Sequence, residues 1–286
     1  MPELPELEVV REVLQRRVVG KTIHSVEVVP PDGLIVVRDL THAGFGSSLV
    51  HCTITAVHRR GKFILLDLQS QSKRWILLIN PKLTGLLQLA DSLEKRKPKT
   101  LVILDFGDGS QLRYRDTKQM GQLYLAEELS SVPEFAAMGP EALDISLEEF
   151  RARLKPYRGE IKGVLTRGDF VAGIGNAYAD EILWAARLHP FRKRTQLTPV
   201  EVETLYLAMR STLFAAIEKV RQEMGEIIDQ KPREFMAVHM KTGEPCPRCG
   251  TPISLVGANQ RITNFCRTCQ PGGLIKGMVS AAKRSS

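Results

Sequence analysis

Four cysteines near the C-terminus constrain the fold of this chain more than any other feature. Cys246 and Cys249 form one pair, Cys266 and Cys269 form a second, and 16 residues separate the pairs. Each pair can lie on a tight turn that directs two thiolates inward, and two such pairs complete a tetrahedral zinc site. Since cysteine fills all four positions, no coordination position remains for a catalytic water. We therefore predict one structural Zn²⁺ ion.

The residues between the two pairs are predicted to form a two-stranded hairpin over 253–256 and 261–265. A segment this small needs the metal to hold its shape. Its connecting loop is polar and includes Arg261, which suits contact with phosphates or bases. Zinc ribbons also occur in proteins that bind only other proteins. This element alone therefore leaves open both a DNA-binding protein and a protein-binding adaptor.

The composition favours a cytoplasmic protein with an anionic partner. With 286 residues, 43% of them hydrophobic, the chain can bury a large core and divide into two or more domains. Its net charge of +8 suits nucleic acid or an anionic membrane surface. No apolar run approaches the roughly 20 residues of a spanning helix, so we expect no membrane partner. We expect the fifth cysteine, Cys52, to be buried and the protein to be a monomer.

Hydrophobic periodicity separates a β-rich first part from a helical second part. An amphipathic helix is predicted over Pro5–Val19, ended by Gly20. Short runs rich in Val, Ile and Leu predict a β-sandwich or barrel, with strands at 23–29, 53–58, 62–68, 75–79, 101–106 and 111–115. From Val132 onward helices dominate. The expected fold class is therefore α+β, with a β-sandwich domain over 1–131, a helical domain over 132–236 and a zinc-finger domain over 237–286.

Capping signals place three helices in the second part. Ser146, followed by Glu149, predicts a helix over 147–154, and Thr198 opens another that runs to about Glu223. The turn Gly173–Asn176 precedes a third helix over 177–188. Exposed backbone amides at such a helix start form a natural phosphate site, to which the Asn176 side chain can add a donor. A simple helix cap explains the same residues, so the turn alone leaves both interpretations open.

The N-terminus provides a possible nucleophile. Removal of Met1 by aminopeptidase, which accepts a small second residue, would leave Pro2 as a free secondary amine. Such an amine is partly unprotonated near neutral pH. It can attack an electrophilic carbon and form an iminium, and the neighbouring Glu3 can donate a proton. Read alone, Pro2 can equally be a chance second residue before a helix.

Four segments together resemble the formamidopyrimidine-DNA glycosylase and endonuclease VIII family of base-excision repair enzymes. They are Pro2–Glu6, Arg59–Phe63, Asn176–Glu181 and Gln260–Cys266, and they occur in the family's order. The resemblance spans about residues 2–272. It implies a bifunctional DNA glycosylase and AP lyase that binds double-stranded DNA with damaged bases or abasic sites, has a helix–two-turns–helix domain, and is associated with the nucleoid.

The resemblance also implies roles for individual residues. Pro2 would attack the anomeric carbon of a nucleotide flipped out of the duplex, and Glu3 would protonate the sugar ring oxygen. Glu6 would hold the N-terminal helix or a water chain in place. Lys62 would bind the phosphate next to the lesion, although a lysine at the start of a strand is commonly just solvated.

Three further residues would contact DNA from the second half of the chain. Lys162 matches a lysine of the family that lies near the damaged nucleotide. Asn176 and Arg261 would grip the phosphates that flank the flipped sugar, from the helical and zinc elements respectively. Phosphate contacts position the protein and carry little sequence information.

Three departures from the family pattern bear on specificity. The family's His-Leu-Gly-Met-(Ser/Thr)-Gly loop is replaced by 80–85, in which Leu83 would fill the gap left by the flipped base while the phosphate-binding His is lost. The family's Asp-Pro-Arg-Arg-Phe-Gly is replaced by 116–121, with Met120 as an apolar wedge. Lys118 lacks the two-donor fork with which Arg reads a base.

The third departure is the stretch 225–246, which is shorter than in family members that enclose 8-oxoguanine. These differences leave an alternative open, namely an AP lyase or a damage-binding protein with little 8-oxoguanine excision. A zinc-containing DNA-binding protein without catalysis is a further alternative, but it gives no reason for Pro2 and Glu3.

Overall fold

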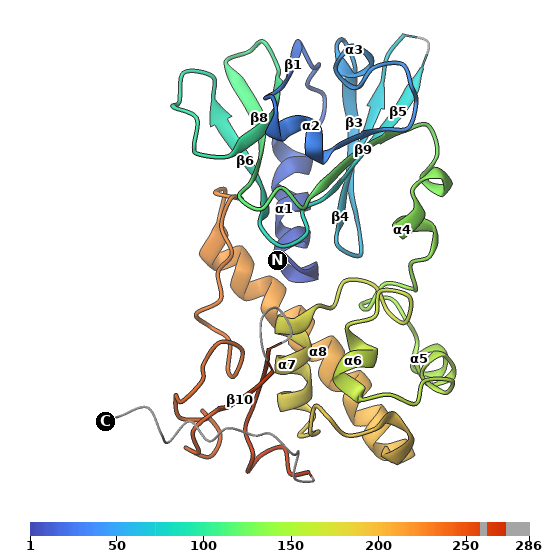
Figure 1. The fold of residues 1–286 in the computed structure, drawn as a ribbon, viewed down its shortest axis with the longest axis vertical. Helices are drawn as coiled ribbons and strands as arrows, with labels where there is room; N and C mark the ends of the chain where they lie inside the picture. Colours follow the sequence, from blue (N-terminus) through green and yellow to red (C-terminus); the bar gives the residue numbers. More distant parts are fainter. Residues whose placement is uncertain (72, 258–261, 273–286) are drawn as a thin grey trace. The chain divides into compact units, whose positions relative to one another are not determined.

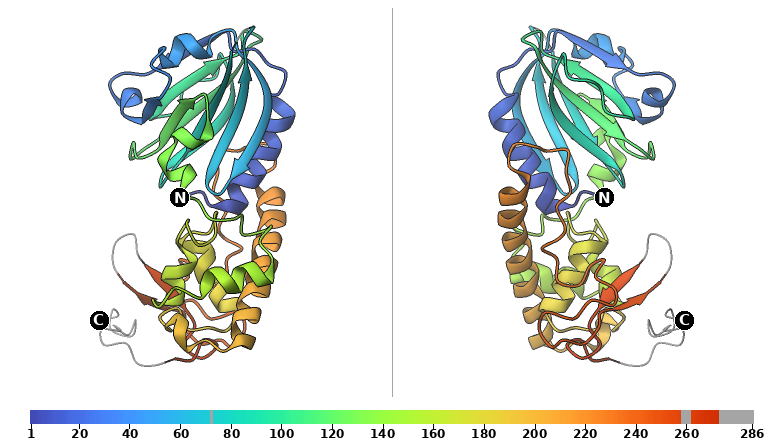
Figure 2. Two further views of the ribbon diagram at one scale, coloured as in Figure 1. Left: turned by 90° about the vertical axis from the view of Figure 1, so that its right-hand side faces the viewer. Right: turned by 90° about the vertical axis from the view of Figure 1, so that its left-hand side faces the viewer.

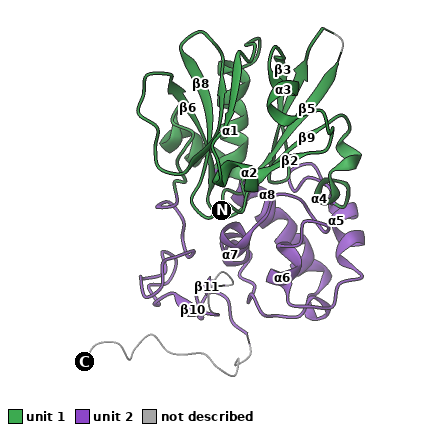
Figure 3. Ribbon diagram, turned by 45° about the horizontal axis from the view of Figure 1, so that its top comes forward, with its two compact units in different colours: residues 1–137, 217–232 green, residues 138–216, 233–286 purple. Residues whose placement is uncertain are grey.

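The structure is a computed structural model that describes residues 1–71, 73–257 and 262–272. The chain divides into two compact units, 1–137 with 217–232 and 138–216 with 233–286 (Figure 3). The division falls inside helix α8 (Pro199–Met224), so this helix contributes to both units. The three-domain division expected from the sequence remains a proposal about the folding units.

The first unit opens with helix α1 (Leu4–Arg17), which packs its apolar face on strands β3 and β4 (Figure 1). The helix begins one residue before the predicted start because Glu3 caps it. It ends at Arg17, two residues before the predicted end. Gly20 adopts a positive φ of 84° beyond the helix, where its N–H donates to the Ile54 carbonyl.

Two sheets form the layers of the first unit (Figures 1 and 2). One has the antiparallel order β1-β7-β8-β6, and the other has the order β2-β9-β5-β4-β3 with only β2–β9 parallel. The strands are β1 Ser25–Val28, β2 Val37–Asp39, β3 Thr53–Arg60, β4 Phe63–Gln69, β5 Arg74–Asn80, β6 Gly85–Asp91, β7 Thr100–Asp105, β8 Ser110–Asp116 and β9 Gln122–Ala126.

All six strands predicted for this region are present, each with its ends moved by two residues or fewer. Three of the observed strands, β2, β6 and β9, were not predicted from the sequence. Strand β6 was not predicted because it begins at Gly85, and glycine usually weakens a strand. Here its bare Cα is required, since a Cβ at Gly85 would lie 2.3 Å from the Tyr114 hydroxyl. Cys52 is buried, as expected.

Short helices complete the first unit: α2 (Asp32–Val36), α3 (Phe45–Leu49), the 3₁₀ turn η1 (Leu129–Ser131) and α4 (Pro133–Ala136). The second unit contains α5 (Leu147–Leu154), α6 (Ile161–Leu165), α7 (Asn176–Ala185), the 3₁₀ turn η2 (Arg194–Gln196), most of α8 and the hairpin β10 (Ser254–Val256) with β11 (Thr263–Phe265). In the part of the chain that the structure describes, no helix is long and apolar enough to cross a membrane.

The capping predictions for the second unit are confirmed. Ser146 accepts a hydrogen bond from the Glu149 N–H at the start of α5. Thr198 and Glu201 exchange hydrogen bonds at the start of α8. Helix α7 begins at Asn176 with Gly175 as its N-cap, and it ends at Ala185, three residues before the predicted end.

Candidate active site and zinc centre

A pocket of about 310 Å³, including open solvent, lies in the first unit beside the N-terminus. Pro2 and Glu6 line it together with apolar residues of α1, β4 and β5. Its remaining walls come from Pro81 in the loop before β6, from the first three residues of β6, 85–87, and from Ile228 and Gln230. The pocket therefore brings the predicted nucleophile to the same place as the loop that carries Leu83.

The two glutamates of the N-terminal motif hold each other in position. Glu3 is 3% exposed and Glu6 is 1% exposed. The Glu3 N–H donates to Glu6 Oε2 at 2.8 Å, and the Glu3 side chain accepts from the Glu6 N–H. This reciprocal cap satisfies two backbone donors at the start of α1. The arrangement fixes the backbone that follows Pro2, whose ring nitrogen is a peptide nitrogen until Met1 is removed.

Lys62 lies at the tip of the β3–β4 hairpin, directly after Gly61 and one residue before β4. Gly61 supplies the positive φ of 57° that this two-residue turn requires. Burial lowers the pKa of Lys62, and the charge of Lys82 lowers it further, while Glu3 and Glu6 act in the opposite direction. Lys62 is thus close enough to both glutamates to interact with them electrostatically.

An ion pair fixes the hairpin to the first helix. Arg59 Nε donates to Glu8 Oε2 at 2.6 Å, and the Arg59 side chain is only 7% exposed. Burial by itself would raise the pKa of Glu8, but hydrogen bonds from Arg59 and Arg11 outweigh it and lower the pKa. Because Arg59 also donates to the Gly61 carbonyl, the pair positions the turn that presents Lys62.

The loop that carries Leu83 contains a lysine to which the sequence prediction gave no role. Lys82 adopts a positive φ of 48°, and its N–H donates to Asn80 Oδ1 at 3.3 Å. Its Nζ donates to Glu134 at 2.7 Å, and the Asn80 side-chain amide donates to the same carboxylate. Leu83 itself is half-buried. Glu134 lies 52 residues away from Lys82 in α4, so no local pattern could have indicated this pair.

Lys118 and Met120 lie on the loop that follows β8. The Lys118 side chain is exposed, and Met120 is 48% exposed. Exposure of a large apolar side chain suits a wedge that enters DNA. The backbone N–H of Lys118 donates to Thr84 Oγ1 at 2.9 Å, which connects this loop to the one that carries Leu83.

Lys162 occupies the interior of the second unit. It is 6% exposed and lies 2.7 Å from Asp180 Oδ1. Its Nζ also donates to the Ile262 carbonyl and to Thr263 Oγ1. These partners connect α6 with α7 and with the start of β11. The predicted contact between Lys162 and DNA stays a prediction, and the structure adds a role for this lysine inside the protein.

Asn176 begins α7 and is half-buried, directly after the Gly173–Gly175 turn. Gly173 has a φ of 100°, a conformation that favours glycine. Asn176 is therefore at the helix start that the sequence predicted as a phosphate site. The third predicted DNA contact of this half, Arg261, lies outside the described residues.

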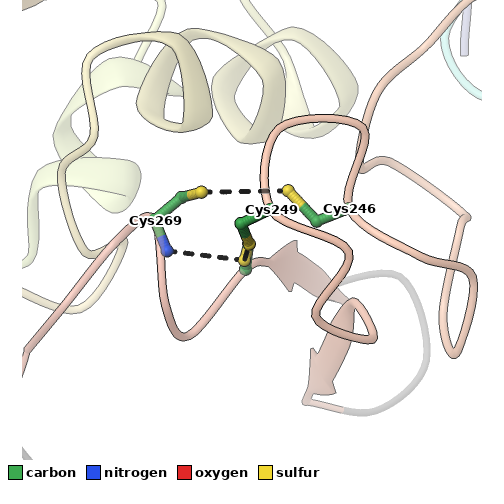
Figure 4. A group of neighbouring side chains, drawn as sticks. Cys246, Cys249 and Cys269 are labelled. Atoms are coloured by element: carbon green, nitrogen blue, oxygen red, sulfur yellow. Dashed lines mark hydrogen bonds between the residues drawn. The ribbon is translucent and has the colours of Figure 1, made fainter.

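The four paired cysteines gather in the second unit, with their sulfurs all within 4.8 Å of one another. The Sγ–Sγ distance is 3.9 Å between Cys246 and Cys269, whose sulfurs point toward each other in Figure 4. It is 3.4 Å between Cys249 and Cys266. A tetrahedral zinc with Zn–S bonds of about 2.3 Å separates its sulfurs by roughly 3.8 Å. The four thiols therefore fit one structural Zn²⁺.

Three neighbouring residues, Thr251, Trp184 and Arg248, support the cysteine cluster. The pKa of Cys249 is lowered to about 6 by hydrogen bonds with the side chain and backbone of Thr251, which favours the thiolate that binds metal. Trp184 Nε1 lies 3.4 Å from Cys246 Sγ and donates to it. Arg248 covers the Trp184 ring at 4.0 Å and donates to the Trp184 carbonyl. Sequence reasoning missed Trp184 because 62 residues separate it from Cys246.

Comparison with known sequence families identifies three successive regions. Residues 1–123 match the formamidopyrimidine-DNA glycosylase N-terminal domain, and 137–226 match the H2TH domain of the same enzyme. Residues 243–272 match a zinc finger found in FPG and IleRS. Together these matches cover most of the chain and include the N-terminal motif, the Asn176 turn and all four paired cysteines.

Curated relatives align over nearly the full length. The formamidopyrimidine-DNA glycosylase of Exiguobacterium sibiricum is 37% identical over 280 residues, covering 94% of this chain and 99% of the relative. The protein of the same name from Symbiobacterium thermophilum is 36% identical over 283 residues, covering 95% of this chain and 90% of the relative.

Solved structures agree. The Lactococcus lactis Fpg in complex with abasic-site DNA superposes with a TM-score of 0.81 at 29% identity, covering 94% of this chain and 100% of that chain. The same enzyme in complex with DNA that contains Fapy-dG gives a TM-score of 0.82 at 30% identity, with the same coverage. The sequence motifs, the clustered cysteines and these likenesses agree, and the chain belongs to the formamidopyrimidine-DNA glycosylase family.

Proposed function

We propose that this protein removes oxidised or ring-opened bases from double-stranded DNA through an iminium formed at Pro2. Its overall activity is that of its family, bifunctional base excision and strand cleavage in base-excision repair. The proposal adds the roles of individual residues. The observation that carries it is the N-terminal cap, which places Pro2 at a pocket together with Glu6 and fixes Glu3 beside it.

The first chemical step forms a bond between the Pro2 nitrogen and the anomeric carbon of the flipped nucleotide, while the bond to the base breaks and the departing base takes up the proton that the amine nitrogen loses. Glu3 protonates the sugar ring oxygen, so the ring opens and the nitrogen and carbon become an iminium. The iminium acidifies the neighbouring sugar proton. Loss of that proton expels the 3′ phosphate and cuts the strand.

The remaining predicted residues bind and orient the DNA. Lys62 at its hairpin tip holds a phosphate near the lesion, and Asn176 holds another from the start of α7. Leu83 and Met120 fill the space that the flipped base leaves. Glu6 keeps Glu3 in place through the reciprocal cap. When bound, Zn²⁺ supplies no chemistry to the reaction. It holds the β10–β11 hairpin in place by binding cysteines on both sides of it, among them Cys246 and Cys249.

Borohydride trapping on a duplex with a single abasic site tests the nucleophile. Protein with a processed N-terminus should form a covalent adduct, and protein with a retained N-terminal tag should form less than about a hundredth as much, because the Pro2 nitrogen is then an amide. Lys62→Met serves as the control and should still trap when DNA is saturating. Trapping at normal yield by the tagged protein would assign the nucleophile to another amine.

We also propose a preference for abasic sites and ring-opened or ring-saturated bases over 8-oxoguanine. Lys118 and Gln119 stand where the family has two arginines, and a bidentate Arg discriminates bases by about 1–3 kcal/mol. A flexible ammonium should tolerate several opposite bases, with less than about tenfold preference among them. Single-turnover excision of each lesion opposite each base tests this. Strong 8-oxoguanine excision restricted to a cytosine partner would contradict it.

The site of action follows from the substrate. An enzyme that acts on chromosomal DNA works where that DNA lies, so we propose association with the nucleoid. Co-sedimentation of the protein with nucleoids in a cell lysate, reversed by nuclease, is the expected result.

A further inference from the structure

The loops that carry Leu83 and Met120 share one buried polar cluster, which we call the Asp116 node. It consists of Asp116, Tyr114, Thr84 and the backbone N–H groups of Lys118 and Gly121. Asp116 ends β8 and is 0% exposed. A buried carboxylate is costly unless its oxygens accept hydrogen bonds. The groups that donate to Asp116 are therefore groups that the fold must hold close to it.

Hydrogen bonds from both loops converge on the Asp116 carboxylate. Oδ1 accepts from the Thr84 hydroxyl and, at 3.2 Å, from the Lys118 N–H. Oδ2 accepts from the Gly121 N–H at 2.7 Å and from the Tyr114 hydroxyl at 3.2 Å. The Thr84 hydroxyl in turn accepts from the Lys118 N–H. Two donors on each carboxylate oxygen fill the positions that an ionised carboxylate offers.

Two glycines, one from each loop, lie against the Tyr114 hydroxyl. A Cβ at Gly85 would lie 2.3 Å from the Tyr114 hydroxyl oxygen, and a Cβ at Gly121 would lie 1.6 Å from it. Gly85 ends the loop of Leu83 and Gly121 ends the loop of Met120. Burial, followed by the charge of Asp116, raises the pKa of Tyr114, so its hydroxyl keeps its proton and remains a donor.

We propose that the Asp116 node makes the two loops a single wedge, so that Leu83 and Met120 enter the duplex together rather than independently. Thr84, Tyr114 and Asp116 are positioning residues, because they contact the loops and not the reacting sugar. The inference rests on the proposed function of Leu83 and Met120 as the side chains that fill the gap. It deepens that function by stating that one structural element supports both.

The test compares Thr84→Val with wild type on two abasic substrates, a duplex and a single strand. A single strand has no gap to fill, so its reaction with Pro2 needs no wedge. Thr84→Val keeps the side-chain shape and removes the bond to Asp116. We expect the single-turnover cleavage rate to fall about tenfold on the duplex, since a hydrogen bond to a charged group is worth roughly that much. The single-strand rate should change less than twofold.

The coupling itself is tested with Met120→Ala in both backgrounds. In wild type this change should lower the duplex rate at least fivefold, and in Thr84→Val it should lower it less than twofold, because the shared support is already lost. If Met120→Ala lowers the duplex rate by the same factor in wild type and in Thr84→Val, the two substitutions act independently and the proposal is overturned. Thr100→Val, which removes another Thr hydroxyl bond of the same unit, is the matched control and should leave both rates unchanged.

Two outcomes separate this inference from the proposed function. If wild-type protein with a free Pro2 traps neither substrate, the proposed nucleophile fails. If it traps both, and Thr84→Val slows both equally, the node has no specific role in duplex insertion. Should Thr84→Val not fold, Tyr114→Phe removes a different bond to the same carboxylate and gives the same comparison.

Discussion

Two buried or partly buried lysines show how differently the two units use positive charge. Lys162 in the second unit has an aspartate at 2.7 Å and two further oxygen acceptors. Lys62 in the first unit lies at a hairpin tip, where burial and a second lysine lower its pKa. The sequence prediction assigned both to DNA. The protein itself satisfies the charge of Lys162, whereas burial and Lys82 lower the pKa of Lys62 against the opposing effects of Glu3 and Glu6.

The same difference extends to the two sites as a whole. The pocket beside Pro2 is formed by α1 and two sheets whose apolar residues form a core. Among the described residues, the cysteine centre has around it a small buried cluster made of Val238, Cys246, Ile253 and Cys266, with Trp184, Ala237 and Cys269 packed against it. One site thus depends on hydrophobic burial and the other on metal and buried ion pairs. Four changes test this contrast.

Loss of zinc should have the largest effect. Cys249→Ser should release the metal and abolish DNA binding while leaving the sheets of the first unit folded. Structural zinc stabilises such small elements by roughly 10 kcal/mol or more in peptides. Metal analysis, circular dichroism and DNA titration measure the three consequences, and Cys52→Ala is the control that should retain zinc. Protein purified without chelator that contains no zinc would refute the assignment.

Lys162→Met should destabilise the second unit by about 3–5 kcal/mol, because it leaves Asp180 charged, buried and without its lysine. Urea denaturation measures the free energy of unfolding. Adding Asp180→Asn should recover part of the loss, and Lys62→Met should cost far less stability while weakening DNA binding. The contrast between the lysines breaks down if Lys162→Met leaves stability unchanged and lowers only the affinity for DNA.

Trp184→Phe should loosen the zinc centre without unfolding it. The change removes the indole N–H that donates to Cys246. Loss of a hydrogen bond to a metal ligand typically costs 10- to 100-fold in metal affinity, so we expect faster zinc release to a chelator by about tenfold. Trp75→Phe in the first unit is the matched control. Equal release rates for the two variants would show that the Trp184 contact does not stabilise the metal.

The smallest effect concerns pH. Because the pKa of Lys62 is lowered, its side chain loses its charge at a pH below the ordinary lysine pKa of about 10.4. DNA binding should therefore weaken as the pH rises from the lowered pKa toward that ordinary value. The sign for stability is opposite, since the cost of burying the charge is full below the lowered pKa and is relieved as pH rises. Lys62→Arg should retain binding to higher pH, because Arg stays charged. Identical alkaline limbs in wild type and Lys62→Arg, with exposed Lys95→Arg as control, would exclude Lys62 as the titrating group.

Local sequence patterns correctly predicted those features that depend on a short stretch of the chain. The cysteine spacing predicted a cluster that fits zinc, and Ser146 and Thr198 predicted two helix starts. Partners distant in sequence could not be predicted in this way. Lys82 meets Glu134 and Trp184 meets Cys246 only after the chain has folded, and the burial of Lys162 depends on strand β11. Apart from Tyr114, the members of the Asp116 node fall within two segments that the sequence singled out, 80–85 and 116–121, but their contact required the pairing of β6 with β8.

The segment 217–232 has a consequence for how the enzyme can be divided. The chain leaves the first unit after residue 137 and returns to it 80 residues later. There Asp229 binds Lys97 and Arg115, and Ile228 completes a wall of the pocket. A fragment ending at 137 would therefore lack part of the wall of the pocket beside Pro2 and leave two cations without their carboxylate. The first unit is not a separable N-terminal module, and its completion must await synthesis of a segment that lies beyond most of the helical region.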